Sequence, residues 1–229
     1  MTKFTTAVLL SGGLDSAVLL AEETAVGDVQ PIYVSAGLAW EAAERIAVTR
    51  FLEAAPLPRL RPLASLTVDM RDVYPEQHWA LAGNPPGYHT ADEKVYLPGR
   101  NVILLSKAAV FCAAEGISRL VLGTLGRNPF PDATPAFRGA MAVALSLGLA
   151  HTLDIDAPYS NLSKVEVIRR GNRLRLPLEL TLSCMNPPPT RREVRHCGRC
   201  SKCRERHDAF VGAAIADPTD YHDTQFIRA

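Results

Sequence analysis

The chain has 229 residues, 47% of them hydrophobic, and a formal net charge of +1. This length fits one large α/β domain with a small appended element, and it is enough to bury a sizeable core. The near-neutral charge excludes a global field that would draw the protein to nucleic acid or to a membrane surface. The apolar run 7–10 is too short for a signal peptide, and the uncharged stretch 139–153 is too short to span a bilayer. We therefore expect a cytoplasmic protein without a membrane partner, whose five cysteines stay reduced or bind metal.

Hydrophobic strands alternate with helices along the chain. Strands are expected at 7–10, at 29–35, within 60–70, at 120–125 and at 152–159. Helices are expected at 15–25, at 40–55, at 101–115, at 137–149 and from 164 to about 170, the last opened by the capping box formed by Ser163 and Glu166. Residues 71–99, rich in proline, glycine and aromatic residues, are expected to be an irregular lid or binding loop.

The alternation predicts an α/β fold with a doubly wound, mostly parallel sheet covered on both faces. Ligands of such sheets lie at the carboxyl ends of the strands, so the loops after residues 10, 36, 125 and 159 are expected to meet at one cleft. Residues 184–210 follow this pattern as a basic, cysteine-rich appendage.

The most specific motif is a Ser/Gly turn between the first strand and the first helix. Gly12 and Gly13 carry no Cβ, so a ligand can approach the backbone closely, and the amides of 13–16 would point out of the helix start, where the dipole favours an anion. Asp15 is acidic at this position and is expected to hold Mg²⁺ or to cap the helix. An ordinary capped turn is the alternative. The residues expected to bind a nucleotide are Leu10, Ser11, Gly12, Gly13, Leu14, Asp15, Ser16 and Ala17.

Four of the five cysteines lie in one short window, as Cys184, Cys197, Cys200 and Cys203. A divalent cation relieves the repulsion between thiolates so close together, and Zn²⁺ takes four of them tetrahedrally. We therefore expect a structural zinc site, with an iron–sulfur cluster and free thiols as alternatives. We expect His196 to be a basic surface residue. The alternative is that it acts as a substitute ligand of the metal. Basic side chains between 191 and 206 would offset the charge of the metal centre.

The segment from Ser11 to Ser16 resembles the pyrophosphate loop (PP-loop) of the N-type ATP pyrophosphatases. Together with the cysteines and with segments 97–101, 130–137, 158–166 and 177–184, it makes the chain resemble the 7-cyano-7-deazaguanine synthase family of the queuosine pathway nearly end to end. The resemblance implies an adenine nucleotide alpha hydrolase-like, Rossmann-like PP-loop domain over 1–183. It also implies a small four-cysteine zinc-binding element with a C-terminal helix over 184–229, and a homodimer.

The resemblance implies an ATP-dependent carbon–nitrogen ligase. Such an enzyme converts 7-carboxy-7-deazaguanine and ammonia to the nitrile by way of an adenylated carboxylate and then an adenylated amide. Arg100 and Lys164 are expected to stabilise the charge that builds on the phosphates; a surface arginine and a helix-start lysine are the alternatives. Asp132 is expected to bind a purine-like edge or Mg²⁺, or to be a turn residue. The expected catalytic residues are thus Asp15, Ser16, Arg100, Asp132 and Lys164.

Two loops depart from the family pattern. Residues 34–38 lack the family's acid and amide, and residues 123–134 are shorter and lack its Cys-Arg pair. Both loops are expected to line the acceptor side of the cleft, so a related amide-forming ligase for another carboxylate is an alternative function. A tRNA-modifying adenylyltransferase, served by the basic run 191–206, and a non-catalytic nucleotide-binding module stabilised by zinc are further alternatives. The net charge argues against nucleic acid, and the expected partners are a deazapurine carboxylate, ammonia and a second copy of the chain.

Overall fold

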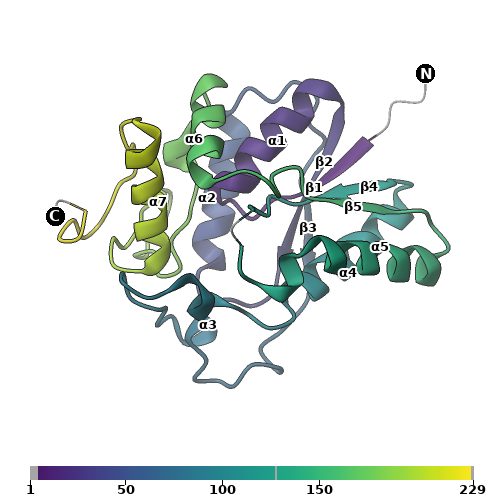
Figure 1. The fold of residues 1–229 in the computed structure, drawn as a ribbon, viewed down its shortest axis with the longest axis horizontal. Helices are drawn as coiled ribbons and strands as arrows, with labels where there is room; N and C mark the ends of the chain where they lie inside the picture. Colours follow the sequence, from purple (N-terminus) through teal and green to yellow (C-terminus); the bar gives the residue numbers. More distant parts are fainter. Residues whose placement is uncertain (1–4, 127, 228–229) are drawn as a thin grey trace.

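A parallel sheet with helices on both faces forms the centre of the molecule (Figure 1). The computed structural model describes residues 5–126 and 128–227; residues 1–4 and 228–229, at the ends of the two predicted domains, and Arg127, in the loop 123–134, lie outside the described residues. The strand order is β3-β2-β1-β4-β5, and every neighbouring pair is parallel. The strands are β1 (Thr5–Leu9), β2 (Asp28–Ser35), β3 (Ala64–Thr67), β4 (Arg119–Val121) and β5 (Asp154–Asp156).

The helices divide between the two faces of the sheet as a doubly wound fold requires. On one face α1 (Leu14–Val26), α2 (Glu41–Ala54) and α6 (Lys164–Arg173) share a hydrophobic core with β1. On the other face α4 (Arg100–Ala114) and α5 (Pro135–Leu149) pack over a separate core (Figure 1). The predicted α/β class and the double winding are therefore confirmed.

Several element ends differ from the predicted ones for local reasons. Helix α5 begins two residues early, because the Thr134 hydroxyl accepts a bond from the Phe137 amide and Pro135 takes the first helical position, where its missing N–H costs nothing. Strands β4 and β5 are shorter than predicted, because their chains leave the sheet at its carboxyl edge to form loops. The predicted irregular segment 71–99 contains α3 (Trp79–Ala82) and one turn of 3₁₀ helix, Asp92–Val95.

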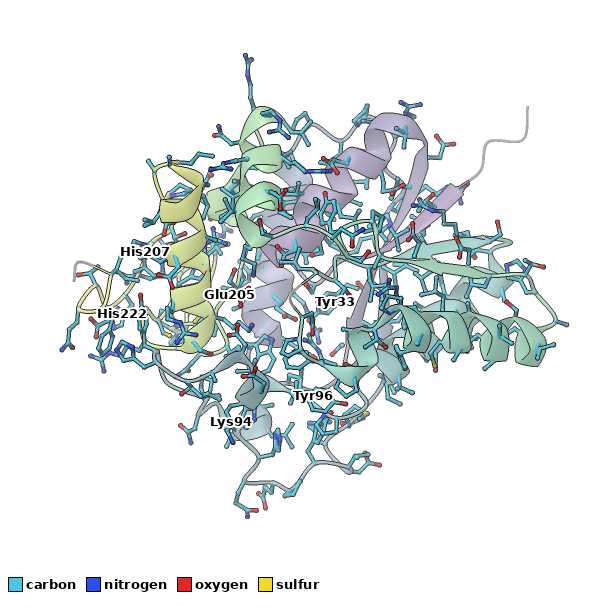
Figure 2. The ribbon with its side chains drawn as sticks, in the orientation of Figure 1. Tyr33, Lys94, Tyr96, Glu205, His207 and His222 are labelled. Atoms are coloured by element: carbon cyan, nitrogen blue, oxygen red, sulfur yellow. The ribbon has the colours of Figure 1, made fainter. Side chains whose placement is uncertain are left out.

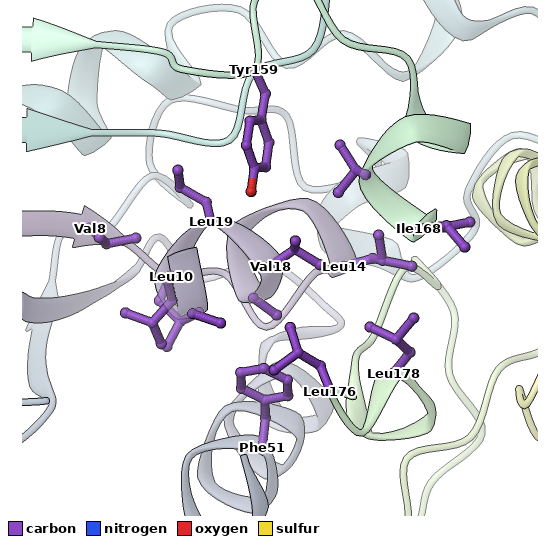
Figure 3. Close-up of a cluster of buried hydrophobic side chains, with 14 of the residues drawn as sticks. Val8, Leu10, Leu14, Val18, Leu19, Phe51, Tyr159, Ile168, Leu176 and Leu178 are labelled. Atoms are coloured by element: carbon purple, nitrogen blue, oxygen red, sulfur yellow. The ribbon is translucent and has the colours of Figure 1, made fainter. Parts of the chain in front are cut away.

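The C-terminal part of the chain packs directly on the sheet-and-helix body. Helix α7 (Ser201–Ala213) lies beside α6 (Figure 1), and Phe210 is fully buried in the core shared by α1 and α6. The Leu182 amide donates to the Gly12 carbonyl at 2.8 Å, which ties the segment before the cysteines to the first turn. Burial of a large apolar side chain contributes about 1.5–3 kcal/mol. Figure 3 shows members of this core on α1 and around it: Val8, Leu10, Leu14, Val18, Leu19, Phe51, Tyr159, Ile168, Leu176 and Leu178.

Candidate active site

The turn between β1 and α1 presents backbone amides at the carboxyl edge of the sheet. Gly12 has a φ of 76°, and a Cβ there would come 3.1 Å from both the Glu44 carbonyl oxygen and a methyl group of Val48, so only glycine fits. Gly13 is the N-cap of α1 and supplies no side-chain hydrogen bond. The first amides of a helix have no partner within the helix, and the dipole adds positive potential there. The start of α1 is therefore suited to an anion.

Two serine hydroxyls brace this turn from within. Ser16 donates to the Gly13 carbonyl at 3.0 Å, and its oxygen lies 3.3 Å from both the amide and the hydroxyl of Ser11. Since both hydroxyls lie at the helix start, they can turn toward a phosphate with little rearrangement.

A cavity of about 550 Å³ opens beside the turn. Loops following β1, β4 and β5 contribute to its walls, as predicted for the carboxyl edge of the sheet. A narrower cavity of about 240 Å³ adjoins it and shares Ser11, Asp15 and Arg100. Residues 34–38, expected on the acceptor side, line neither cavity in the described part of the chain. Trp40 and Glu44 of the following helix line the larger cavity instead.

Asp15 and Lys164 meet at the cavity, as members of a chain of alternating charges. Lys164 Nζ lies 3.3 Å from a carboxylate oxygen of Asp15 and also pairs with Glu205, which itself lies 2.5 Å from Lys202. Glu205 projects from α7 toward the centre of the molecule (Figure 2). Burial alone would lower the pKa of Lys164, but Asp15 and Glu205 together raise it, so the ammonium is permanent at neutral pH.

Asp15 keeps one oxygen available for a ligand. Its Oδ1 is buried and has no hydrogen-bond partner among the described residues. Burial raises the pKa of Asp15, although Lys164 acts in the opposite direction. A buried carboxylate oxygen without a partner is costly, and a cation or a donor from a ligand would relieve that cost.

Arg100 and Asp132 come together at the start of α4. Asp132 accepts a hydrogen bond from the Asn101 amide at 3.1 Å and so caps α4 from outside the helix. Burial raises the pKa of Asp132 despite this bond, and its second carboxylate oxygen is buried without a partner. Arg100 lines both cavities, and its Nε has no partner among the residues that the structure describes. The arrangement places the Arg100 guanidinium, with an unused Nε donor, at cavities shared with the turn between β1 and α1.

The sequence analysis did not identify Glu44 and Glu205, which are among the acids that line the larger cavity. Glu44 lies on the buried stripe of α2, three, four and seven residues before the buried Ala47, Val48 and Phe51. This helical spacing from buried apolar residues is the sequence signal that predicts a buried Glu44. No local signal identifies Glu205, because its partner Lys164 is far away in the chain.

The four predicted metal ligands form one cluster. The sulfur atoms of Cys184, Cys197, Cys200 and Cys203 all lie within 4.8 Å of one another. The Cys197 and Asn186 amides point at the Cys184 sulfur from 3.2 and 3.3 Å, an arrangement that stabilises a thiolate. The four sulfur atoms are therefore close enough together to hold one metal ion. The fifth cysteine, Cys112, lies on α4 and is buried in the core between that helix and the sheet.

His196 is not on the surface, which corrects the prediction. It is fully buried, its Nε2 accepts a hydrogen bond from the Ser183 amide at 3.0 Å, and burial lowers its pKa well below the usual value. It is therefore neutral, and it supports the segment that carries Cys184 rather than acting as a surface cation.

The basic run 191–206 is largely occupied by contacts within the protein. Arg206 is fully buried and donates to Leu178, Thr181, Ser183 and Thr219. Most of the other basic side chains pair with carboxylates: Arg195 with Asp220, Arg199 with Asp223, Lys202 with Glu205 and Arg204 with Asp92. These contacts engage most of the positive charge of the run within the protein.

A parallel sheet with an anion-binding turn at its carboxyl edge defines a class of α/β nucleotide-binding proteins. Within that class, the family model described as "Queuosine biosynthesis protein QueC" matches residues 5–214, and the chain belongs to this family. Its relatives include "7-cyano-7-deazaguanine synthase 1" of Mesorhizobium japonicum, 34% identical, with 96% of this chain and 94% of the relative covered. "7-cyano-7-deazaguanine synthase" of Methanopyrus kandleri is also 34% identical, with 95% of this chain and 98% of the relative covered. None of the described helices is long and apolar enough to cross a bilayer.

Proposed function

We propose that this protein converts 7-carboxy-7-deazaguanine and ammonia to 7-cyano-7-deazaguanine at the expense of ATP. Membership of the QueC family and the names of the relatives support the activity. The observation that carries the proposal is one cavity where the uncapped start of α1 meets two basic side chains, Arg100 and Lys164. This combination suits a triphosphate whose charge shifts during transfer.

In the proposed reaction the turn binds ATP, and its amides from Gly13 to Ser16 hold the phosphates that leave as pyrophosphate. The acceptor carboxylate oxygen attacks the α-phosphate, and ammonia then displaces AMP to give the amide. A further ATP adenylates the amide oxygen, and loss of AMP leaves the nitrile. Lys164 and Arg100 stabilise the developing negative charge, a contribution that typically lowers the barrier by about 2.7–4 kcal/mol for each such donor.

Mg²⁺ fits this site as a partner of ATP. The unpartnered Oδ1 of Asp15 is the type of oxygen ligand that Mg²⁺ prefers, and when bound the ion neutralises phosphate charge. We assign the unpartnered oxygen of Asp132, which lines the narrower cavity together with Asp15, as a second candidate contact, either to the ion or to a ligand N–H.

We propose zinc as the metal of the cysteine cluster and residues 184–229 as the element that binds it, appended to a PP-loop domain over 1–183. Cys200 lies 3.5 Å from Cys203 and 4.0 Å from Cys184, sulfur to sulfur. Tetrahedral Zn–S bonds of about 2.3 Å require separations of about 3.8 Å, so the cluster fits zinc. All four positions would be filled by protein, which makes the ion structural. We place the protein in the cytosol, where such thiols stay reduced.

We propose a homodimer that pairs through α5. Val143 and Leu147 of this helix are 62% and 79% exposed, and no charged residue lies between Arg138 and Asp154. Apolar side chains grouped on a helix face that is open to water favour association with a second copy.

The decisive experiment incubates the protein with ATP, ammonium and 7-carboxy-7-deazaguanine and identifies the products by mass spectrometry. We expect the nitrile, AMP and pyrophosphate, with no product from Asp15→Ala. Accumulation of the amide alone would identify an amide-forming ligase. Tight ATP binding without pyrophosphate release would contradict the proposal and favour a non-catalytic nucleotide-binding module.

A further inference from the structure

A buried acid lines the larger cavity and has no role in the chemistry proposed above. Glu44 on α2 is only 8% exposed, and no ion pair within 4.0 Å joins it to another described residue. Trp40 Nε1 donates to one of its carboxylate oxygens at 2.9 Å, and the Tyr33 hydroxyl donates to the other at 3.1 Å. Each carboxylate oxygen can accept a second hydrogen bond. The side chain is thus fixed in orientation and keeps acceptor capacity on both oxygens.

The surroundings of Glu44 suit a flat heterocycle. The Trp40 and Trp79 rings stack with centroids 5.8 Å apart and planes 10° apart, and both residues line the cavity. Arg100 and Glu41 are the charged groups that act on Glu44 most strongly. A Cβ added at Gly12 would lie 3.1 Å from the Glu44 carbonyl oxygen, so the backbone of Glu44 adjoins the turn between β1 and α1.

We propose that Glu44 determines specificity for the acceptor base by accepting hydrogen bonds from two adjacent N–H groups of a guanine-like edge. This inference rests on the proposed function and names the residue that recognises its acceptor. A guanine-like edge offers a ring N–H beside an exocyclic amino group, two donors that match the two oxygens of a carboxylate. An adenine edge offers an amino group beside a ring nitrogen that only accepts, so it matches one oxygen at most. The chemistry therefore favours the deazaguanine over the adenine of ATP.

Burial supports this assignment energetically. It raises the pKa of Glu44 to about 7, although the charge of Arg100 lowers it, so the donors within the protein only partly compensate the buried charge. Two donors from a ligand would complete the compensation. A ligand that lacks one hydrogen bond to a charged group of the protein typically binds about 10–100-fold more weakly.

The test uses two acceptors and a matched pair of variants. The acceptors are 7-carboxy-7-deazaguanine and its analogue without the 2-amino group, and their binding is followed by quenching of tryptophan fluorescence in the presence of a non-hydrolysable ATP analogue. The variant is Glu44→Gln. The control is Glu41→Gln, one turn earlier on α2 and equally buried, whose carboxylate binds the Ala36 amide and the Ser35 hydroxyl outside the cavity.

We expect the wild type and Glu41→Gln to bind the full acceptor about 10–100-fold more tightly than the analogue. In Glu44→Gln this preference should collapse to less than about threefold, with the affinity for the ATP analogue unchanged. Equal binding of both acceptors by the wild type would overturn the inference without any variant, and so would full discrimination by a folded Glu44→Gln. Weaker binding of the ATP analogue alone would assign Glu44 to the nucleotide and overturn the inference. If neither acceptor binds the wild type while ATP does, the proposed function itself fails.

Discussion

Replacing Glu205 by glutamine tests how much its ion pairs with Lys164 and Lys202 stabilise the fold. The carboxylate lies between Lys164 and Lys202, and all three side chains are at most a quarter exposed. Burial would raise the pKa of Glu205, but Lys164 and Lys202 bring it from an ordinary 4.5 to about 2. This difference corresponds to about 3 kcal/mol of stability. Because the folded pKa is the lower one, the contribution is fully present above pH 4.5 and is lost only as the pH falls toward 2.

We therefore expect Glu205→Gln to lower the free energy of unfolding by about 2–3 kcal/mol at about pH 7.5, measured by urea denaturation of metal-saturated protein. Neutral pH is required because acid would also protonate the clustered thiols. Asp208→Asn is the control, since Asp208 is exposed on the same helix and makes no ion pair among the described residues. A loss below about 1 kcal/mol, typical of surface pairs, would refute the reasoning.

Four further predictions test other parts of the molecule. Gly12→Ala should lower stability by at least about 1–2 kcal/mol and weaken ATP binding in calorimetry, since alanine disfavours the positive φ; unchanged ATP affinity would argue against the turn as the site. Cys200→Ser should lose bound metal and melt earlier, because metal affinity is folding free energy, and full metal stoichiometry would contradict this. Because the pKa of Glu44 is about 7, its carboxylate is mostly charged at about pH 7.5 and mostly protonated at about pH 6. The KM for the acceptor should therefore rise about tenfold as the pH falls over this range, while the KM for ATP does not. Leu147→Glu should give monomers in sedimentation experiments with little change in melting, because Leu147 is exposed.

The sequence predicts correctly those structural features that depend on residues close together in the chain. The turn from Ser11 to Ser16 follows from a strand, two glycines and a helix start in succession. The cysteine cluster follows from the spacing of three thiols, and the only distant partner, Cys184, is close enough in the chain to be included. The capping box at Ser163 is found as predicted, with the Glu166 carboxylate accepting from the Ser163 amide at 2.7 Å.

The features that the sequence does not predict depend on contacts between distant segments. Glu205 is on the C-terminal helix, and only the packing of α7 against α6 brings it to Lys164. His196 lies in a basic, polar stretch typical of a surface, yet the chain folds over it and supplies the Ser183 amide as its partner. Local composition cannot show such burial, because the covering residues come from elsewhere in the fold.

Segments next to the four clustered cysteines reach the turn between β1 and α1, and its Asp15, through two independent contacts. The Leu182 amide, two residues before Cys184, donates to the Gly12 carbonyl, and Glu205, two residues after Cys203, pairs with the lysine that faces Asp15. A cluster that anchors both segments therefore fixes one backbone bond and one charge at the site where ATP is proposed to bind. Loss of a bound metal would free both contacts together. We therefore expect it to lower ATP affinity as well as the free energy of unfolding. A metal ion bound by all four cysteines, although it would have no open coordination position, would in this way support the proposed catalysis, because it would hold in place Glu205, the partner of Lys164.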